Sequence, residues 1–172
     1  MTNPPFSLLR EFLNWIMGGN KKFLIIGPQN AITYKEVFAL IKDNKIWLGN
    51  THPKRFMDKN NGMADKSFGN ICWFTNMEIS KRKFWLDTGI EYEYGMKRGW
   101  YEKYDNYNAI NIDKTSNIPM DYDGVMGVPI SFLEKHNPDQ FEIVKFRKGD
   151  DDKDLRIGEK QPYFRILIRK KL

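Results

Sequence analysis

The feature that most restricts the fold is a short apolar run at residues 23–26, Phe-Leu-Ile-Ile, which Gly27 ends. The run is continuous rather than alternating, and it lies between two stretches with helical spacing of apolar residues, 7–17 and 34–42. A continuous apolar run of this length is typical of a strand buried on both faces, as in the parallel sheets of α/β proteins. A further strand is expected at 45–48. This order of helix, strand, helix, strand predicts an α/β fold, and more narrowly the second half of a doubly wound sheet.

The two helical stretches carry their own end signals. The first is expected to form a well-buried helix that ends at Gly18-Gly19 and buries Leu8, Leu9, Phe12, Leu13, Trp15 and Ile16. Thr33 is expected to cap the second helix, because Glu36 stands at the capping-box position three residues later. The loop at 28–32 follows the apolar strand at its carboxyl end, where α/β proteins place ligand sites.

The rest of the chain shows more strand patterns than helical ones. Strand or apolar segments are expected at 69–76, 108–112, 125–132, 141–146 and 163–168. The aromatic-rich stretch 84–107 has no clean period and is interpreted in one of two ways. It is either an irregular packed segment or a nucleic-acid surface on which rings stack and basic residues hold phosphates. We therefore expect two regions, 1–80 and 81–172, the second β-rich and packed on the same core.

The charge of the chain mildly favours a polyanionic partner. The formal net charge is +6 and the sequence pI is about 9.3. Basic pairs and triplets are scattered along the chain, so each one alone is best interpreted as a solvated face. Together they are compatible with a surface that contacts phosphates.

The cysteine and histidine positions and the hydropathy of the sequence argue against a disulfide-bonded, metal-binding or membrane-spanning protein. The single cysteine, Cys72, lies in an apolar run, which indicates a buried packing role and a reducing compartment rather than a disulfide. His52 and His136 lie far apart without ligand spacing, so no metal site is expected. No apolar run has the length of a membrane span and no signal-peptide pattern opens the sequence, so we expect a cytoplasmic protein without a membrane partner.

The strongest chemical signal is the tetrapeptide Asn3-Pro4-Pro5-Phe6, directly before the first predicted helix. The lone pair of an exocyclic amine on a nucleobase is delocalised into the ring, so the amine is a poor nucleophile until acceptors hold its hydrogens. The side-chain oxygen of Asn3 and the carbonyl of Pro4 can accept these two hydrogens and orient the lone pair toward a methyl donor. Prolines make such a turn rigid, and Phe6 offers a flat face on which a base taken out of the duplex can stack. The same tetrapeptide also suits a plain helix start, with Asn as cap and Pro in the first turn.

Taken as a whole, the chain resembles the EcoRI-type adenine-specific DNA methyltransferase family, whose catalytic signature is the Asn-Pro-Pro-aromatic turn. The resemblance rests on blocks that run nearly end to end, at 2–7, 21–36, 69–76, 104–111, 121–133 and 137–144. It implies transfer of a methyl group from S-adenosylmethionine to the exocyclic amine of adenine in double-stranded DNA, as part of a restriction-modification system. It also implies a Rossmann-like methyltransferase sheet.

The resemblance also assigns site residues. Asn3, Pro4, Pro5 and Phe6 occupy the catalytic motif, and Phe6 would hold the flipped adenine. The segment 69–76 corresponds to later strands that help to wall the base pocket, which suggests Trp73, Phe74 and Asn76 as further contacts with the base.

One part of the family pattern is missing. Enzymes of this class hold the cofactor with a Gly-rich loop that, in this family, lies before the tetrapeptide. Here only Met1 and Thr2 precede it, and no Gly-x-Gly occurs elsewhere in the sequence. We therefore identify no cofactor-binding residue and expect the carboxy-terminal portion of an enzyme, inactive alone. It is either a truncated reading frame or one piece of a split enzyme, and in the second case another chain would supply the cofactor-binding half. The alternatives are a non-enzymatic DNA-binding or specificity module and a degenerate remnant.

Overall fold

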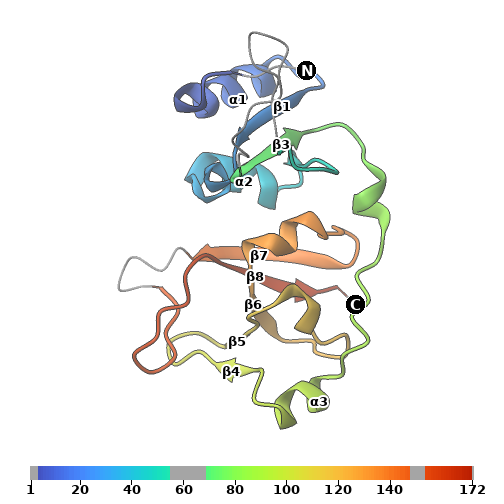
Figure 1. Cartoon of the computed structure of the whole chain (residues 1–172), viewed down its shortest axis with the longest axis vertical. Helices are drawn as coiled ribbons and strands as arrows, with labels where there is room; N and C mark the ends of the chain where they lie inside the picture. Colours follow the sequence, from blue (N-terminus) through green and yellow to red (C-terminus); the bar gives the residue numbers. More distant parts are fainter. Residues whose placement is uncertain (1–3, 55–68, 148–153, 172) are drawn as a thin grey trace. The chain divides into compact units, whose positions relative to one another are not determined.

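The computed structural model of the chain describes residues 4–54, 69–147 and 154–171 (Figure 1). Among the expected features, Asn3 and most of the polar segment at 50–68 lie outside the described residues. The chain divides into two compact units, Met1–Ile79 and Ser80–Leu172, and each contains its own β-sheet. No helix in the described ranges is long and apolar enough to cross a membrane.

The first unit combines helices with a three-stranded sheet, which agrees with the predicted α/β class. The sheet order is β1-β3-β2, and β3 is antiparallel to both of its neighbours. Strands β1 and β2 therefore run in the same direction, joined through α2, while β3 returns between them. The elements are η1 (Phe6–Leu8), α1 (Leu9–Gly18), β1 (Leu24–Pro28), η2 (Gln29–Thr33), α2 (Lys35–Lys42), β2 (Trp47–Leu48) and β3 (Ile71–Thr75).

Strand β1 is buried as the apolar run predicted, with Ile25 and Ile26 almost inaccessible to solvent. The expectation of a parallel neighbour is wrong within the described residues, because the strand that pairs with β1 is the antiparallel β3. A continuous apolar run reports burial of both faces and not the direction of the adjacent strand. In the described part of the chain, the other edge of β1 has no strand beside it.

Two local expectations for the helices are also corrected. Only Leu9 and Leu13 of α1 are buried, whereas Trp15 is 73% exposed and Leu8 is half exposed, so the helix buries one narrow stripe. The capping box at Thr33 does not form. The Thr33 hydroxyl donates to the Asn30 carbonyl at 2.8 Å within η2, and α2 begins after Tyr34 without a side-chain cap.

The second unit is built on a five-stranded sheet of order β4-β5-β6-β8-β7. Strands β5 and β6 are parallel, and the other pairings are antiparallel. Strands β5 and β7 lie where the sequence pattern predicted them, and β8 starts two residues later than expected. The elements are η3 (Ser80–Lys83), α3 (Tyr92–Lys97), β4 (Glu102–Lys103), β5 (Ala109–Asn111), η4 (Thr115–Asn117), β6 (Val125–Pro129), η5 (Ile130–Glu134), β7 (Phe141–Arg147) and β8 (Arg165–Lys170).

The aromatic stretch 84–107 contains both kinds of residue that the sequence left open. Tyr101 and Tyr104 are buried, and the Tyr104 hydroxyl donates to Asn111 Oδ1 at 2.8 Å. Trp85 and Tyr94, in contrast, are exposed. The stretch is therefore a packed segment in some positions and a surface in others.

Candidate active site

The start of α1 is held against the carboxyl end of β1 by a glycine. A Cβ atom placed on Gly27 would lie 2.8 Å from Leu9 Cδ2, closer than real Cβ atoms approach a neighbour, and 3.1 Å from Phe74 Cε2, which is a tight contact. Leu9 is the first residue of α1, so this contact fixes the amino end of the helix at the end of β1. The turn Pro4–Phe6 precedes α1 by only a few residues and therefore lies near the same end of the strand, where α/β folds bind ligands.

The described part of the tetrapeptide forms a tight turn. The Leu8 N–H donates to the Pro5 carbonyl at 2.9 Å and closes η1. Among the described residues, the Pro4 carbonyl accepts no backbone hydrogen bond, so it is available to another donor. Pro4 is buried, whereas the Phe6 ring is 41% exposed and offers a face to a ligand. The sequence assigned the Pro4 carbonyl the role of an acceptor and the Phe6 ring the role of a stacking surface. Both roles stay predictions, and Asn3 itself lies outside the described residues.

Further residues meet at this end of the sheet, where β1 ends and β3 begins. Pro28 pairs with Ile71, and the Gln29 N–H donates to the Asn70 carbonyl at 2.8 Å. His52 Nδ1 lies 3.1 Å from the carbonyl oxygen of Ile71. The predicted loop at 28–32 therefore lies at the candidate site, and His52 joins it. Sequence reasoning considered His52 only as a metal ligand, because about 20 residues separate it from the strand that positions it.

Trp73 and Phe74 lie in β3, and Asn76 directly follows it. The Phe74 side chain is fully buried against Gly27 in the core. Asn76 lies at the other end of the strand, since Thr75 pairs with Leu24 at the start of β1. Trp73 is half-buried beside Gly49.

Both polar atoms of the Asn76 side-chain amide make hydrogen bonds. Its Oδ1 accepts the Phe23 N–H at 2.9 Å, and its Nδ2 donates to the Lys21 carbonyl at 2.8 Å. The structure thus gives Phe74 a packing role and Asn76 an anchoring role for the start of β1. It does not bring Asn76 to the end of the sheet where Phe6 lies. Contact of these three residues with a base stays a prediction; Trp73 and Asn76 are partly exposed, whereas Phe74 is fully buried.

The described residues contain no group of three or more His, Cys, Asp or Glu side chains that could hold a metal ion. At this end of the sheet, the groups described above are a backbone carbonyl, which can accept hydrogens, and an aromatic ring, on which a planar ligand can stack.

Comparison with known proteins gives consistent matches. The family described as adenine-specific methyltransferase EcoRI matches residues 1–171. The chain is 50% identical to the Type II methyltransferase M.EcoRI of Escherichia coli, over 99% of this chain and 57% of that protein. It is 34% identical to the Type II methyltransferase M.MgeORF184P of Mycoplasma genitalium, over 99% of this chain and 63% of that protein.

A third relative is the Type II methyltransferase M.MpnI of Mycoplasma pneumoniae, 35% identical over 84% of this chain and 50% of that protein. The chain therefore spans between half and two thirds of the length of these curated relatives. No solved structure matches the chain.

Proposed function

The chain belongs to the EcoRI family of adenine-specific methyltransferases, and from this premise we propose that it is part of an enzyme that methylates adenine in DNA. The reaction transfers a methyl group from S-adenosylmethionine to the exocyclic amine of adenine within a restriction-modification system. The observation that supports this best is the Pro4–Phe6 turn near the carboxyl end of β1, in which the Pro4 carbonyl accepts no backbone hydrogen bond from the described residues and the Phe6 ring is partly exposed.

In this proposal each residue of the turn has a separate role. The Asn3 side-chain oxygen and the Pro4 carbonyl accept the two amine hydrogens, which concentrates the lone pair on nitrogen. Phe6 stacks on the adenine after it leaves the duplex. The rigid Pro4-Pro5 backbone keeps the acceptors in one geometry, so less conformational entropy is lost when the base binds. S-Adenosylmethionine, when bound, supplies the methyl group that the oriented lone pair attacks.

The described residues of the first unit do not by themselves fit this cofactor. Enzymes that bind a ribose in an α/β sheet use an acidic side chain after a strand. Neither the segment after β1, residues 29–33, nor the segment after β2, residues 49–54, contains Asp or Glu. The free edge of β1 is the place where a further strand can pair, since an unpaired buried strand is a template for another. We therefore assign the cofactor-binding half to residues outside this sequence, in the same or a partner chain, and expect the present chain alone to be inactive.

A DNA-binding or specificity module without catalysis is the second candidate. It is favoured by an exposed aromatic and basic group on the second unit, in which the Arg98 guanidinium lies 4.6 Å from the Tyr94 ring and 5.6 Å from the Trp100 ring. Rings and guanidinium groups of this kind bind single-stranded or unstacked bases. DNA binding by this chain without any methylation in the completed enzyme would favour this candidate.

The test combines the chain with the cofactor-binding half of a family member and measures methyl transfer from labelled S-adenosylmethionine to duplex DNA. Asn3→Ala should abolish transfer while DNA affinity stays nearly the same. Asn14→Ala, which removes an exposed asparagine from α1, is the matched control and should transfer normally. Unchanged turnover in Asn3→Ala would contradict the assigned role.

Calorimetric titration tests the location of the cofactor site separately. We expect no saturable binding of S-adenosylmethionine to the 172-residue chain, with or without duplex DNA. Clear binding would show that the cofactor site is built within this sequence.

A further inference from the structure

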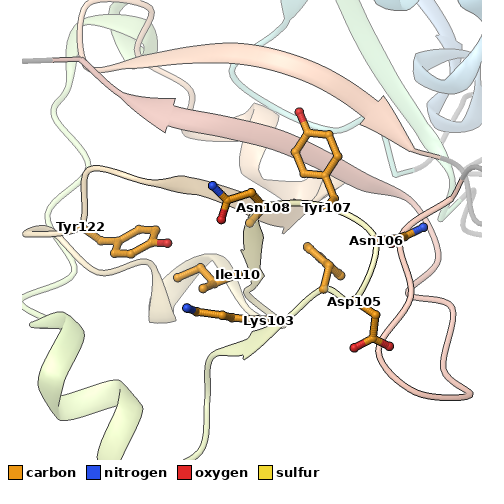
Figure 2. A pocket seen from close by; sticks show the side chains of 9 residues that line it. Lys103, Asp105, Asn106, Tyr107, Asn108, Ile110 and Tyr122 are labelled. Carbon is orange, nitrogen blue, oxygen red and sulfur yellow. The ribbon is translucent and has the colours of Figure 1, made fainter.

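The second unit has a cavity of about 420 Å³ at the turn between β4 and β5 (Figure 2). Its size lies in the range of ligand-binding sites. It is lined by Lys103, Tyr104, Asp105, Asn106, Tyr107, Asn108, Ala109, Ile110 and Tyr122. These residues do not overlap with the candidate active site in the first unit.

Part of the polar lining serves to hold the turn in place. The Asp105 carboxylate accepts the Gly158 N–H at 2.7 Å, and the Asp105 N–H donates to the Arg156 carbonyl at 2.8 Å. Asn106 accepts the Arg156 N–H at 3.0 Å and donates to the Asp154 carbonyl at 2.6 Å. The turn is therefore tied to residues 154–158 by four hydrogen bonds, and its shape is set before any ligand binds.

Three of the remaining polar side chains of the lining, Lys103, Asn108 and Tyr122, have no hydrogen-bond partner among the described residues, whereas the Tyr104 hydroxyl is bound to Asn111. In Figure 2 the side chains of Lys103, Asn108 and Tyr122 point toward a common space beside Ile110. Within the described ranges, neither Lys103 nor Asn108 makes a side-chain hydrogen bond or ion pair, and the Tyr122 hydroxyl makes no hydrogen bond. An exposed turn that uses Asp105 and Asn106 for anchoring but leaves Asn108 unengaged presents that amide to an external partner.

Tyr122 is held in position by its neighbours. Its ring stacks on Tyr92 with centroids 4.6 Å apart, and the Tyr92 N–H is itself held by Asp121 Oδ1 at 2.6 Å. The end of the ring lies against Gly124, where a Cβ atom would collide with it. Burial and the neighbouring Tyr92 raise the pKa of Tyr122, so its hydroxyl keeps its proton and can donate.

We propose that this cavity contacts duplex DNA, with Asn108 reading the edge of an adenine and Lys103 holding a neighbouring phosphate. An asparagine amide presents one acceptor and two donors, which match the N6 and N7 atoms of adenine in the major groove. A lysine ammonium binds phosphate as a point charge, and the Tyr122 hydroxyl can donate to the same backbone. The one carboxylate in the lining, Asp105, is turned to Gly158 and does not oppose a phosphate. This inference rests on the proposed function, because it names the residue through which that function would select its DNA site.

The experiment selects duplexes from a randomised library with the 172-residue chain and its variants. The wild-type chain should enrich a defined sequence. Asn108→Ala should enrich a sequence with the same bases at most positions. At one A·T pair, its discrimination against other base pairs should fall by about 5- to 160-fold, the loss expected for one bidentate contact. Lys103→Ala should weaken binding to all sequences alike and reduce the slope of log affinity against log salt by about 0.9.

Matched controls keep the result specific. Asn14→Ala and Lys114→Ala remove the same side chains at exposed positions outside the cavity, and both should enrich the wild-type sequence with the wild-type salt slope. An unfolding transition like that of the wild type should accompany each variant, because neither Asn108 nor Lys103 packs in the core.

The outcomes separate this inference from the function on which it rests. If the wild type enriches a sequence and Asn108→Ala enriches the same one equally, the reading role of Asn108 is wrong while DNA binding stands. If the wild type enriches no duplex, this inference fails, whereas the methyl-transfer test of Asn3 still decides the proposed function. An unchanged salt slope in Lys103→Ala would show that Lys103 does not contact a phosphate.

Discussion

Leu9 occupies the space that a side chain at residue 27 would need. A Cβ atom on Gly27 would come within 2.8 Å of Leu9 Cδ2, and Phe74 closes the space from β3 at 3.1 Å. Because Leu9 begins α1, the same contact sets where the Pro4–Phe6 turn lies relative to β1. Packing in the core and position of the candidate site are therefore coupled through one glycine.

Gly27→Ala should destabilise the first unit by about 1–3 kcal/mol, the usual cost of an extra methyl group in a filled core. Denaturant unfolding measures this change. Gly18→Ala is the control, because nothing lies within 4 Å of a Cβ atom at that position and alanine favours the helix. Leu9→Ala should cost less in the Gly27→Ala background than in the wild type, since it relieves the collision. Additive costs in the double variant would show that the two residues are not coupled.

Phe6→Ala should weaken the hold on the extruded adenine by about 1–3 kcal/mol, if stacking is the role of this ring. The change should leave the free energy of unfolding within about 0.5 kcal/mol, because the ring is substantially exposed and carries little packing. Fluorescence of 2-aminopurine at the target position reports base extrusion in the completed enzyme. Leu8→Ala, in the same turn and also exposed, should bind the base as the wild type does. Equal fluorescence in both variants would contradict the stacking role.

The positions of most elements could be predicted from sequence, because apolar periodicity reports burial within one segment. Strands β1, β3, β5 and β7 lie where the pattern predicted strands. The order and direction of the strands could not be predicted in this way. Strand β3 inserts antiparallel between β1 and β2, and nothing local in residues 71–75 indicates which partner they pair with.

The candidate site, like the fold, could be predicted only in part from the sequence. The motif Asn3–Phe6 holds the groups of its proposed chemistry in four consecutive residues, so sequence alone could propose it. Its neighbours His52 and Gly27 depend on the fold, because they reach the site through strand pairing and close packing. Asn76 shows the opposite case, in which a residue from a family-like block lies at the other end of the sheet and anchors the start of β1.

Gln140→Leu should destabilise the second unit, because Gln140 satisfies both backbone groups of Leu86. Its Oε1 accepts the Leu86 N–H and its Nε2 donates to the Leu86 carbonyl, each at 2.7 Å and both buried. A leucine of similar size would leave these two groups without partners, at roughly 1–3 kcal/mol each. Urea unfolding at constant m-value measures the loss, and Gln161→Leu at an exposed position is the control.

The conservative variant Gln140→Glu gives a second readout. It keeps an acceptor for the Leu86 N–H but loses the donor for the carbonyl, so its stability at pH 7 should lie below that of the wild type. A wild-type free energy of unfolding for Gln140→Leu would show that the backbone of Leu86 finds other partners.

Stability of the second unit should fall as the pH drops from about 6.5 to about 4, because His136 is buried in its neutral form. Burial lowers the pKa of His136 to about 4, against a hydrogen bond with the Phe141 carbonyl at 3.0 Å that raises it, and Arg82 and Lys171 add to the lowering. The unfolded chain binds the proton near pH 6.5 and the folded chain only near pH 4, so the stability present at pH 7 is lost progressively in this window, by about 3 kcal/mol.

Unfolding free energies between pH 4 and pH 8 measure this loss as the difference between the wild type and His136→Gln, whose amide can still donate to the Phe141 carbonyl. The variant should lose less stability on acidification than the wild type. Parallel curves for the wild type and His136→Gln would mean that His136 takes up its proton equally in both states.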